Sequence, residues 1–240
     1  MNILITGGAS GLGEAITKAL AKDEANTVYF TFNKSEANAK KIESGFTNTV
    51  SIKCDFKDPV SVSSLKNRII GLDLDVLINN AYSGEHIKTY FHKIPEDDFS
   101  ADFYCNVMPS VILAQTVISH FRKKKSGKII TILTSSLLNT PPLGSSVYVA
   151  NKAYMASLVK SWATENIKFN ITSNSVSPSF MQTNLTAGLD ERILEQITDV
   201  HPLKKILTVE EVAEAVLFLA HASPQINGID MVMNAGANLK

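Results

Sequence analysis

The chain has 240 residues, of which 45% are hydrophobic and 19% charged, a size and composition that predict one domain spanning residues 1–240. Basic and acidic residues number 23 each, so the net charge of zero argues against nucleic acid or an anionic membrane as a partner. No apolar run approaches the roughly 18 residues of a membrane span, and the opening MNILITGG is typical of a strand rather than a secretory signal. Two cysteines, Cys54 and Cys105, exclude a disulfide scaffold and a zinc site. We therefore expect a cytoplasmic protein.

Short β-rich apolar runs alternate along the chain with longer segments of helical periodicity. Strands are expected at residues 2–6, 27–32, 50–53, 76–79, 128–133, 171–176 and 230–233. Helices are expected at residues 11–22, 35–44, 59–70, 98–124, 147–166 and 209–221. Continuously apolar strands such as Val76-Leu77-Ile78 indicate burial on both faces. The alternation predicts a doubly wound Rossmann fold, an α/β fold with a seven-stranded, mostly parallel sheet and helices on both faces.

Three segments, 82–95, 136–146 and 179–208, lack regular periodicity, and each follows a predicted strand. In an open parallel sheet, ligands bind at the carboxyl ends of the strands. We therefore expect these three segments to line one crevice and to determine substrate choice.

A glycine-rich turn lies directly between the first predicted strand and the first predicted helix, at Thr6-Gly7-Gly8-Ala9-Ser10-Gly11-Leu12-Gly13. Gly7 suits a tight turn, Gly11 allows close approach of a pyrophosphate to the helix start, and Gly13 allows the helix to pack closely on the sheet. The spacing matches neither G-x-G-x-x-G nor a P-loop, and glycines in turns are common. Its position after the first strand favours a dinucleotide site formed by Thr6, Gly7, Ser10, Gly11, Leu12 and Gly13.

The end of the second predicted strand bears on which dinucleotide is bound. NAD-binding proteins place an Asp or Glu there for the ribose hydroxyls, but here the first acid is Glu36, after Asn33-Lys34-Ser35. Lys34, with the side chains of Asn33 and Ser35, could hold a 2′-phosphate. The alternative is an ordinary polar turn with Ser35 as a helix cap. We favour NADP(H) over NAD(H).

Tyr148 and Lys152 lie four residues apart and therefore on one face of a predicted helix. A free tyrosine titrates near pH ~10, and a nearby positive charge favours its phenolate. The pair therefore suggests a proton-transfer group, although Tyr-x3-Lys also occurs as a surface pair. Ser135, at the end of a predicted strand, could hydrogen-bond a substrate carbonyl, and Asn106 lies in an otherwise apolar helical segment.

Taken together and in this order, these residues resemble the short-chain dehydrogenase/reductase family in its single-domain form, including members that reduce 3-oxoacyl groups on carrier proteins. The resemblance covers essentially the whole chain. The further residues that carry it are Asp55, Asn79, Asn80, Ala81, Pro178, Met181 and Thr183.

The resemblance implies roles for four catalytic residues. Tyr148 would donate a proton to the carbonyl oxygen in reduction and accept one in oxidation. Lys152 would bind the nicotinamide ribose and lower the pKa of Tyr148, and Ser135 would polarise the carbonyl. Asn106 would hold a water that connects Lys152 to solvent.

The resemblance also implies cofactor contacts beyond the glycine turn. Asp55 would accept from the adenine amino group, and the backbone from Asn79 to Ala81 would pack by the adenosine ribose. The segment from Pro178, through the Met181 backbone and Thr183, would hold the nicotinamide carboxamide. Two positions depart from the family pattern, since Tyr82 and Ser179 stand where it usually has glycine. Tyr82 would narrow the crevice, contact the cofactor or point to solvent.

Partners other than the substrate are less sharply indicated. The five histidines show no metal-ligand spacing. Arg122 to Lys125, with Lys128, forms a basic run that is either a solvated helix end or a dock for an acidic carrier protein. Apolar residues on several faces of the segments 98–124 and 147–166 indicate a homodimer or homotetramer.

The sequence thus predicts an oxidoreductase that transfers a hydride between NADP(H) and a carbonyl or secondary alcohol. A β-ketoacyl thioester and a keto-sugar are both conceivable substrates, small or carrier-bound. The alternative is a non-catalytic, nucleotide-binding regulatory protein on the same fold.

Overall fold

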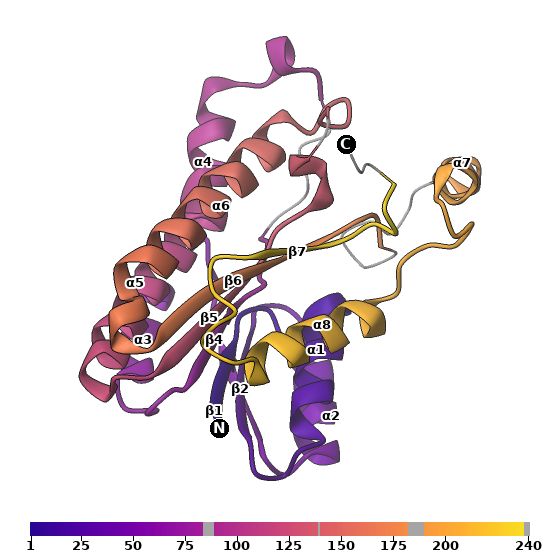
Figure 1. Cartoon of the computed structure of the whole chain (residues 1–240). Helices are drawn as coiled ribbons and strands as arrows, with labels where there is room; N and C mark the ends of the chain where they lie inside the picture. The colour runs from indigo at the N-terminus through magenta and orange to yellow at the C-terminus, as the bar shows by residue number, and fades with distance from the viewer. Residues whose placement is uncertain (84–88, 139, 182–189, 238–240) are drawn as a thin grey trace.

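The computed structural model describes residues 1–83, 89–138, 140–181 and 190–237 (Figure 1). Within these ranges, seven strands form one sheet: β1 (Asn2–Ile5), β2 (Thr27–Phe32), β3 (Thr49–Lys53), β4 (Val76–Asn79), β5 (Gly127–Ile132), β6 (Ile171–Pro178) and β7 (Asp230–Met233). Their order is β3-β2-β1-β4-β5-β6-β7. Every neighbouring pair is parallel.

Helices cover both faces of this sheet, as Figure 1 shows. On one side lie α1 (Gly11–Ala21), α2 (Glu36–Gly45) and α8 (Val209–His221). On the other lie α3 (Pro59–Ile69), α5 (Met108–Lys124) and α6 (Ser146–Asn166), with α4 (Glu96–Asn106) packed against α5 and α6. The predicted doubly wound Rossmann architecture is confirmed, and the sheet is wholly parallel.

The core lies on both faces of the sheet because side chains alternate along each strand. In β1, Ile3 and Ile5 pack under α1 and α8, whereas Leu4 packs on the opposite face with α3 and α5. All three side chains are fully buried. This double burial explains why the central strands read as continuous apolar runs.

The predicted helix over residues 98–124 is two helices. It begins earlier, at Glu96, and is interrupted at Val107 between α4 and α5. Pro109, in the first turn of α5, has no backbone N–H to donate to the carbonyl one turn earlier and therefore ends the first helix. The interruption leaves Asn106 as the last residue of α4.

The segment 179–208, predicted to be irregular, contains a helix. This is α7 (Glu191–Val200), whose N-cap Asp190 accepts a 2.8 Å hydrogen bond from the backbone N–H of Arg192. None of its residues is buried, and Figure 1 shows it standing apart from the two helical layers. The spacing of Ile193, Leu194 and Ile197 is the periodicity that could have revealed it.

The sheet order places a topological switch at β1, whose neighbours β2 and β4 extend the sheet in opposite directions. The carboxyl ends of adjacent strands at such a switch form a ligand crevice. The glycine turn follows β1, and the segment beginning at Asn80 follows β4. The fold therefore brings the predicted cofactor and catalytic residues to one edge of the sheet.

Candidate active site

The glycine turn between β1 and α1 has the backbone conformation that the sequence predicts. Gly7 and Gly11 have φ angles of +68° and +51°, in the left-handed region. At Gly13, a Cβ atom would lie 2.0 Å from the carbonyl oxygen of Gly7. The turn therefore requires glycine both for its conformation and for the close contact with the start of α1.

The first turn of α1 offers backbone donors to an anion. Ser10 is the N-cap residue, but among the described residues its side chain makes no capping hydrogen bond. The N–H groups that open a helix have no partner within the helix, and they favour negative charge. Leu12 is buried in the core, so only its backbone remains for a ligand. The cradle fits the pyrophosphate of a dinucleotide.

The segment after β4 is tied to the glycine turn by its backbone and by Asn80. The Thr6 hydroxyl oxygen accepts hydrogen bonds from the N–H groups of Asn80 and Ala81, at 2.9 and 3.0 Å. The Asn80 side-chain amide donates to the carbonyl oxygens of Thr6 and Gly7, at 2.9 and 3.3 Å. These predicted cofactor residues thus also hold the two strand ends together.

The end of β2 carries the residues predicted to choose between cofactors. Asn33 and Lys34 are exposed and Ser35 is half-buried. Glu36 pairs with Lys40 at 3.0 Å, and the hydrogen bond and charge of Lys40 hold the pKa of Glu36 below its ordinary value. Among the described residues, Lys34 makes no ion pair, so its charge is free for a ligand.

Asn38 is a residue of this region that the sequence analysis missed. Its side-chain amide donates to the carbonyl oxygen of Ala9 at 2.8 Å and to Glu14 at 2.7 Å. It therefore links α2 to the glycine turn and to α1.

Asp55, predicted to contact adenine, lies just beyond β3, and its carboxylate accepts from the backbone N–H of Lys57 at 2.9 Å.

Tyr148 and Lys152 lie on α6 beside the end of β5. The ammonium of Lys152 donates a 2.7 Å hydrogen bond to the carbonyl oxygen of Ile132 and lies 5.8 Å from the centre of the Tyr148 ring. Ser135 opens a short 3-10 turn (Ser135–Leu137) just after β5. The structure thus places Ser135, Tyr148 and Lys152 at one strand end, although Ser135 and Tyr148 come from different elements.

The pKa values of this pair differ from the prediction. Burial raises the pKa of Tyr148, and a hydrogen bond with the Thr134 side chain opposes that shift. Burial lowers the pKa of Lys152 to about 8. The predicted lowering of the Tyr148 pKa is therefore not found in the protein without its cofactor, because burial is the largest effect on the phenol. Thr134, which was not predicted from the sequence, is a group that favours the phenolate.

Asn106 does not point freely to water but clamps the segment after β4. Its side-chain oxygen accepts from the backbone N–H of Ser83 at 2.6 Å, and its NH2 group donates to the Ser83 carbonyl oxygen at 3.2 Å. The same NH2 group lies 3.1 Å from Asp102. Asn106 thus fixes the chain at Ser83, next to Tyr82.

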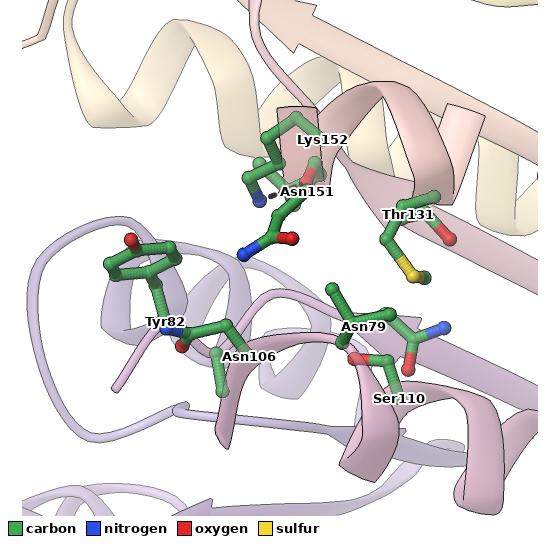
Figure 2. A pocket seen from close by; sticks show the side chains of 11 residues that line it. Asn79, Tyr82, Asn106, Ser110, Thr131, Asn151 and Lys152 are labelled. Carbon is green, nitrogen blue, oxygen red and sulfur yellow. Dashed lines mark hydrogen bonds between the residues drawn. The ribbon is translucent and has the colours of Figure 1, made fainter. Parts of the chain in front are cut away.

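A small cavity lies between Asn106 and Lys152 (Figure 2). Its volume is about 20 Å3, which is sufficient for a single water molecule. Among the described residues, the buried amide of Asn79 and hydroxyl of Thr131, which line it, have no hydrogen-bond partner. The cavity fits the water predicted between Asn106 and Lys152.

Tyr82 points to neither the solvent nor the glycine turn. Its ring packs edge-on against the ring of Tyr148, with 5.3 Å between centroids, and its hydroxyl donates to Asp102 at 3.1 Å. Asp102 also receives a hydrogen bond from Asn151. Neither Asp102 nor Asn151 was predicted from the sequence as part of the site. The spacing of Asp102 and Asn106, one turn apart in a predicted helix, was the available signal.

The segment after β6 is described only in part. Pro178 is the last residue of β6, and Ser179 continues the pairing with β7 through a 2.9 Å hydrogen bond from its N–H to the Met233 carbonyl oxygen. Met181 forms an isolated parallel bridge with Leu207. Thr183, predicted to bind the carboxamide, lies outside the described residues.

Three of the five residues of the basic run at the end of α5, Arg122, Lys124 and Lys128, bond to other parts of the protein. Arg122 donates to Asn166 at 2.7 Å, and Lys124 pairs with Asp73 and Asp75 at 3.1 and 2.7 Å. Lys128 donates to the last carbonyl oxygens of α8. The run also lies at the amino end of β5, opposite the crevice. Both observations count against the suggested dock for a carrier protein.

The residues that the structure describes contain no group of three or more His, Cys, Asp and Glu side chains that could hold a metal ion. None of their helices combines the length and apolarity needed to cross a membrane.

A glycine turn after β1 at a topological switch, with a tyrosine–lysine pair at the end of β5 on the same edge of the sheet, defines the class of dinucleotide-dependent oxidoreductases. The family model adh_short_C2, enoyl-(acyl carrier protein) reductase, matches residues 7–238. The chain therefore belongs to this family of short-chain dehydrogenases/reductases and is an oxidoreductase acting on C=O or CH–OH groups, as the sequence predicts.

Individual relatives are similar over nearly their whole length. The chain is 29% identical to the 3-oxoacyl-[acyl-carrier-protein] reductase FabG of Thermotoga maritima, covering 95% of each chain. It is 27% identical to carbonyl reductase family member 4 of Xenopus tropicalis, covering 98% of this chain and 97% of that protein. A short-chain dehydrogenase from Burkholderia cenocepacia in complex with NADP superposes with a TM-score of 0.87 at 26% identity, covering 99% and 97% of the two chains.

Proposed function

We propose that this protein reduces a carbonyl group with NADPH, or oxidises the corresponding secondary alcohol with NADP+. The observation that carries the proposal is the placement of Tyr148 and Lys152 on one helix at the end of β5, at the same edge of the sheet as the glycine turn after β1. The similar solved structure that holds NADP supports the same cofactor.

The chain's own residues supply proton transfer and orientation. In reduction, the Tyr148 hydroxyl donates its proton to the carbonyl oxygen, and the Ser135 hydroxyl hydrogen-bonds the same oxygen. The ammonium of Lys152 binds the ribose hydroxyls of the nicotinamide nucleoside. The bound cofactor supplies or accepts the hydride.

The preference for the phosphorylated cofactor is assigned to the turn after β2. Lys34 is exposed and without an ion pair among the described residues, and Asn33 and Ser35 flank it. Glu36, the first acid after β2, is held by Lys40. A 2′-phosphate would therefore meet a free cation with hydroxyl and amide donors around it.

The substrate is proposed to be a β-ketoacyl thioester, free or carrier-bound, or a keto-sugar. Similarity to a named 3-oxoacyl-[acyl-carrier-protein] reductase supports the first, and similarity to a carbonyl reductase leaves a broader carbonyl range open. A panel of both classes incubated with NADPH and followed at the nicotinamide absorbance tests the proposal. Turnover of at least one class, abolished in Tyr148→Phe, is the expected outcome. NADPH binding without turnover of any ketone would favour the regulatory, non-catalytic alternative.

We further propose that the protein acts as a homodimer or homotetramer in the cytoplasm. A groove between α4 and α6 is lined by the apolar side chains of Phe99, Phe103, Tyr104 and Val147, and Tyr104 is 65% exposed. An apolar surface of this kind suits a second copy. Both cysteines are free thiols, as expected of a reducing compartment. Sedimentation at micromolar concentration tests the oligomer, which a monomeric value would refute.

A further inference from the structure

Asp102 is a buried carboxylate that the proposed reaction does not use directly. It is 6% exposed and lies on α4, one turn before Asn106. Its two oxygens accept hydrogen bonds from the side chains of Tyr82, Asn106 and Asn151. These three donors belong to the segment after β4, to α4 and to α6. One side chain therefore joins three separate parts of the active site.

Tyr82 connects this carboxylate to the catalytic phenol. Its hydroxyl lies 3.1 and 3.4 Å from the two oxygens of Asp102. Its ring meets the ring of Tyr148 edge-on, at an interplanar angle of 69°. Burial, followed by the charge of Asp102, raises the pKa of Tyr82, so its phenol keeps the proton that it donates. The hydrogen bond thus holds the Tyr82 ring against Tyr148.

Asn151 connects the same carboxylate to α6. Its side-chain NH2 group donates to Asp102 at 2.7 Å, and it directly precedes Lys152. Because a carboxylate only accepts hydrogen bonds, the amide of Asn151 must turn its nitrogen toward Asp102. Figure 2 shows that its oxygen then points toward the side of the pocket where Thr131 lies.

We propose that Asp102 is a positioning residue for Tyr148, acting through Tyr82 and Asn151. The carboxylate fixes the ring that packs on Tyr148 and the helix turn that carries it. Proton transfer requires the reacting oxygens within about 3 Å in the correct direction, so loosening either support lowers the rate without removing a reacting group. The expected loss of rate rests on the proposed function, whereas the support that Asp102 gives to the Tyr148 ring does not.

Two substitutions separate this role from simple stabilisation. Tyr82→Phe keeps the ring and removes the donor. Asp102→Asn replaces one acceptor oxygen by an NH2 group, which only donates, so the side chain cannot accept from all three partners. We expect each to lower kcat about tenfold per folded molecule, with the Kd for NADPH unchanged. If they act through one hydrogen bond, the double variant is no slower than the slower single variant.

Tyr154→Phe and Asp98→Asn are the matched controls. Tyr154 is on α6 and packs on Phe103, while Asp98 is exposed on α4, and among the described residues neither side chain hydrogen-bonds Asp102. We expect both to keep the wild-type kcat. A lowered melting temperature with unchanged kcat of the folded enzyme, or multiplicative losses in the double variant, would overturn the positioning role.

An NMR measurement tests the same relationship without any turnover. The 13Cζ signal of Tyr148, assigned by its loss in Tyr148→Phe, reports the surroundings of the phenol in protein carrying 13C-labelled tyrosine. We expect Asp102→Asn to shift this signal in the wild-type background and to shift it less in Tyr82→Phe, where only the connection through Asn151 remains. An unshifted signal in folded Asp102→Asn would refute the proposal even if no substrate were known. Conversely, a shift without turnover of any ketone would support the positioning role and refute the proposed function.

Discussion

The ammonium of Lys152 donates a 2.7 Å hydrogen bond to the carbonyl oxygen of Ile132, the last residue of β5. This bond fixes the cation over the end of the strand, 5.8 Å from the centre of the Tyr148 ring. It also holds the ammonium away from bulk water, and burial accordingly lowers the pKa of Lys152 to about 8.

The buried charge of Lys152 predicts a pH-dependent stability. Lowering the pKa from 10.5 to about 8 corresponds to roughly 3 kcal/mol at most, since part of the residue is accessible. The folded state binds fewer protons than the unfolded state between these values, so stability rises with pH from about 8 to 10.5. Below pH 8 the full cost is present.

Lys152→Met removes this cost. We expect its stability relative to wild type to be most favourable at pH 7 and to decline toward pH 10.5, as measured by urea unfolding at a series of pH values. Lys160→Met, which replaces an exposed lysine on the same helix, is the control. A difference between Lys152→Met and wild type that is independent of pH would contradict the lowered pKa.

Tyr148→Phe removes the proton donor and leaves the ring contact with Tyr82 in place. We expect kcat to fall by about 10²–10⁴-fold, the usual worth of a general acid or base, with cofactor affinity nearly unchanged. Steady-state kinetics and NADPH fluorescence titration measure the two quantities. Undiminished turnover would exclude Tyr148 as the proton donor.

Thr134 is expected to set the pH profile of alcohol oxidation. Its hydrogen bond lowers the pKa of Tyr148 against the larger effect of burial. Thr134→Val removes that bond, so the pKa of Tyr148 rises and the rise of kcat/KM with pH moves to higher pH. Thr134→Ser keeps the hydroxyl and should retain the wild-type profile. Identical profiles for all three proteins would show that this bond does not tune the phenol.

Lys34→Ala tests the proposed phosphate contact. We expect the Kd for NADPH to rise about tenfold, the worth of one charge-assisted hydrogen bond, and the Kd for NADH to stay the same. Lys41→Ala, which replaces an exposed lysine on the following helix α2, should change neither Kd value. Equal weakening of both cofactors would locate the 2′-phosphate elsewhere.

Gly13→Ala tests the cofactor turn itself. The added Cβ would meet the Gly7 carbonyl oxygen at 2.0 Å, which forces the turn open. We expect a loss of about 1–3 kcal/mol in the free energy of unfolding and at least tenfold weaker binding of both dinucleotides. In Gly45→Ala, the new methyl group meets nothing within 4 Å, so stability and binding should be preserved.

The local pattern of apolar and turn residues in the sequence was sufficient to predict the sheet and the strand ends at which the site lies. The strands β2, β4 and β7 have the predicted bounds, because apolar runs and turn residues mark both ends of each. The glycine turn has the predicted conformation because its geometry depends on residues adjacent in sequence.

Features that depend on contacts distant in sequence could not be predicted. The pKa of Tyr148 is raised because the packing of α6 in the fold buries the phenol, and the depth of burial is a tertiary property. The hydrogen bond between Asp102 and Asn151 spans 49 residues of sequence. In contrast, the interruption at Val107 follows from Pro109, a local signal that the helical pattern concealed.

The sheet order has a consequence for assembly of the native state. Residues 2–5 occupy an interior position between two halves of the sheet, while residues 230–233 occupy one margin. Deleting β1 would separate the two halves of the sheet, whereas deleting β7 would expose only the edge of β6. Strand β1 also pairs with β4, which lies more than 70 residues further along the chain. The entropy lost on closing this loop slows formation of the sheet during folding.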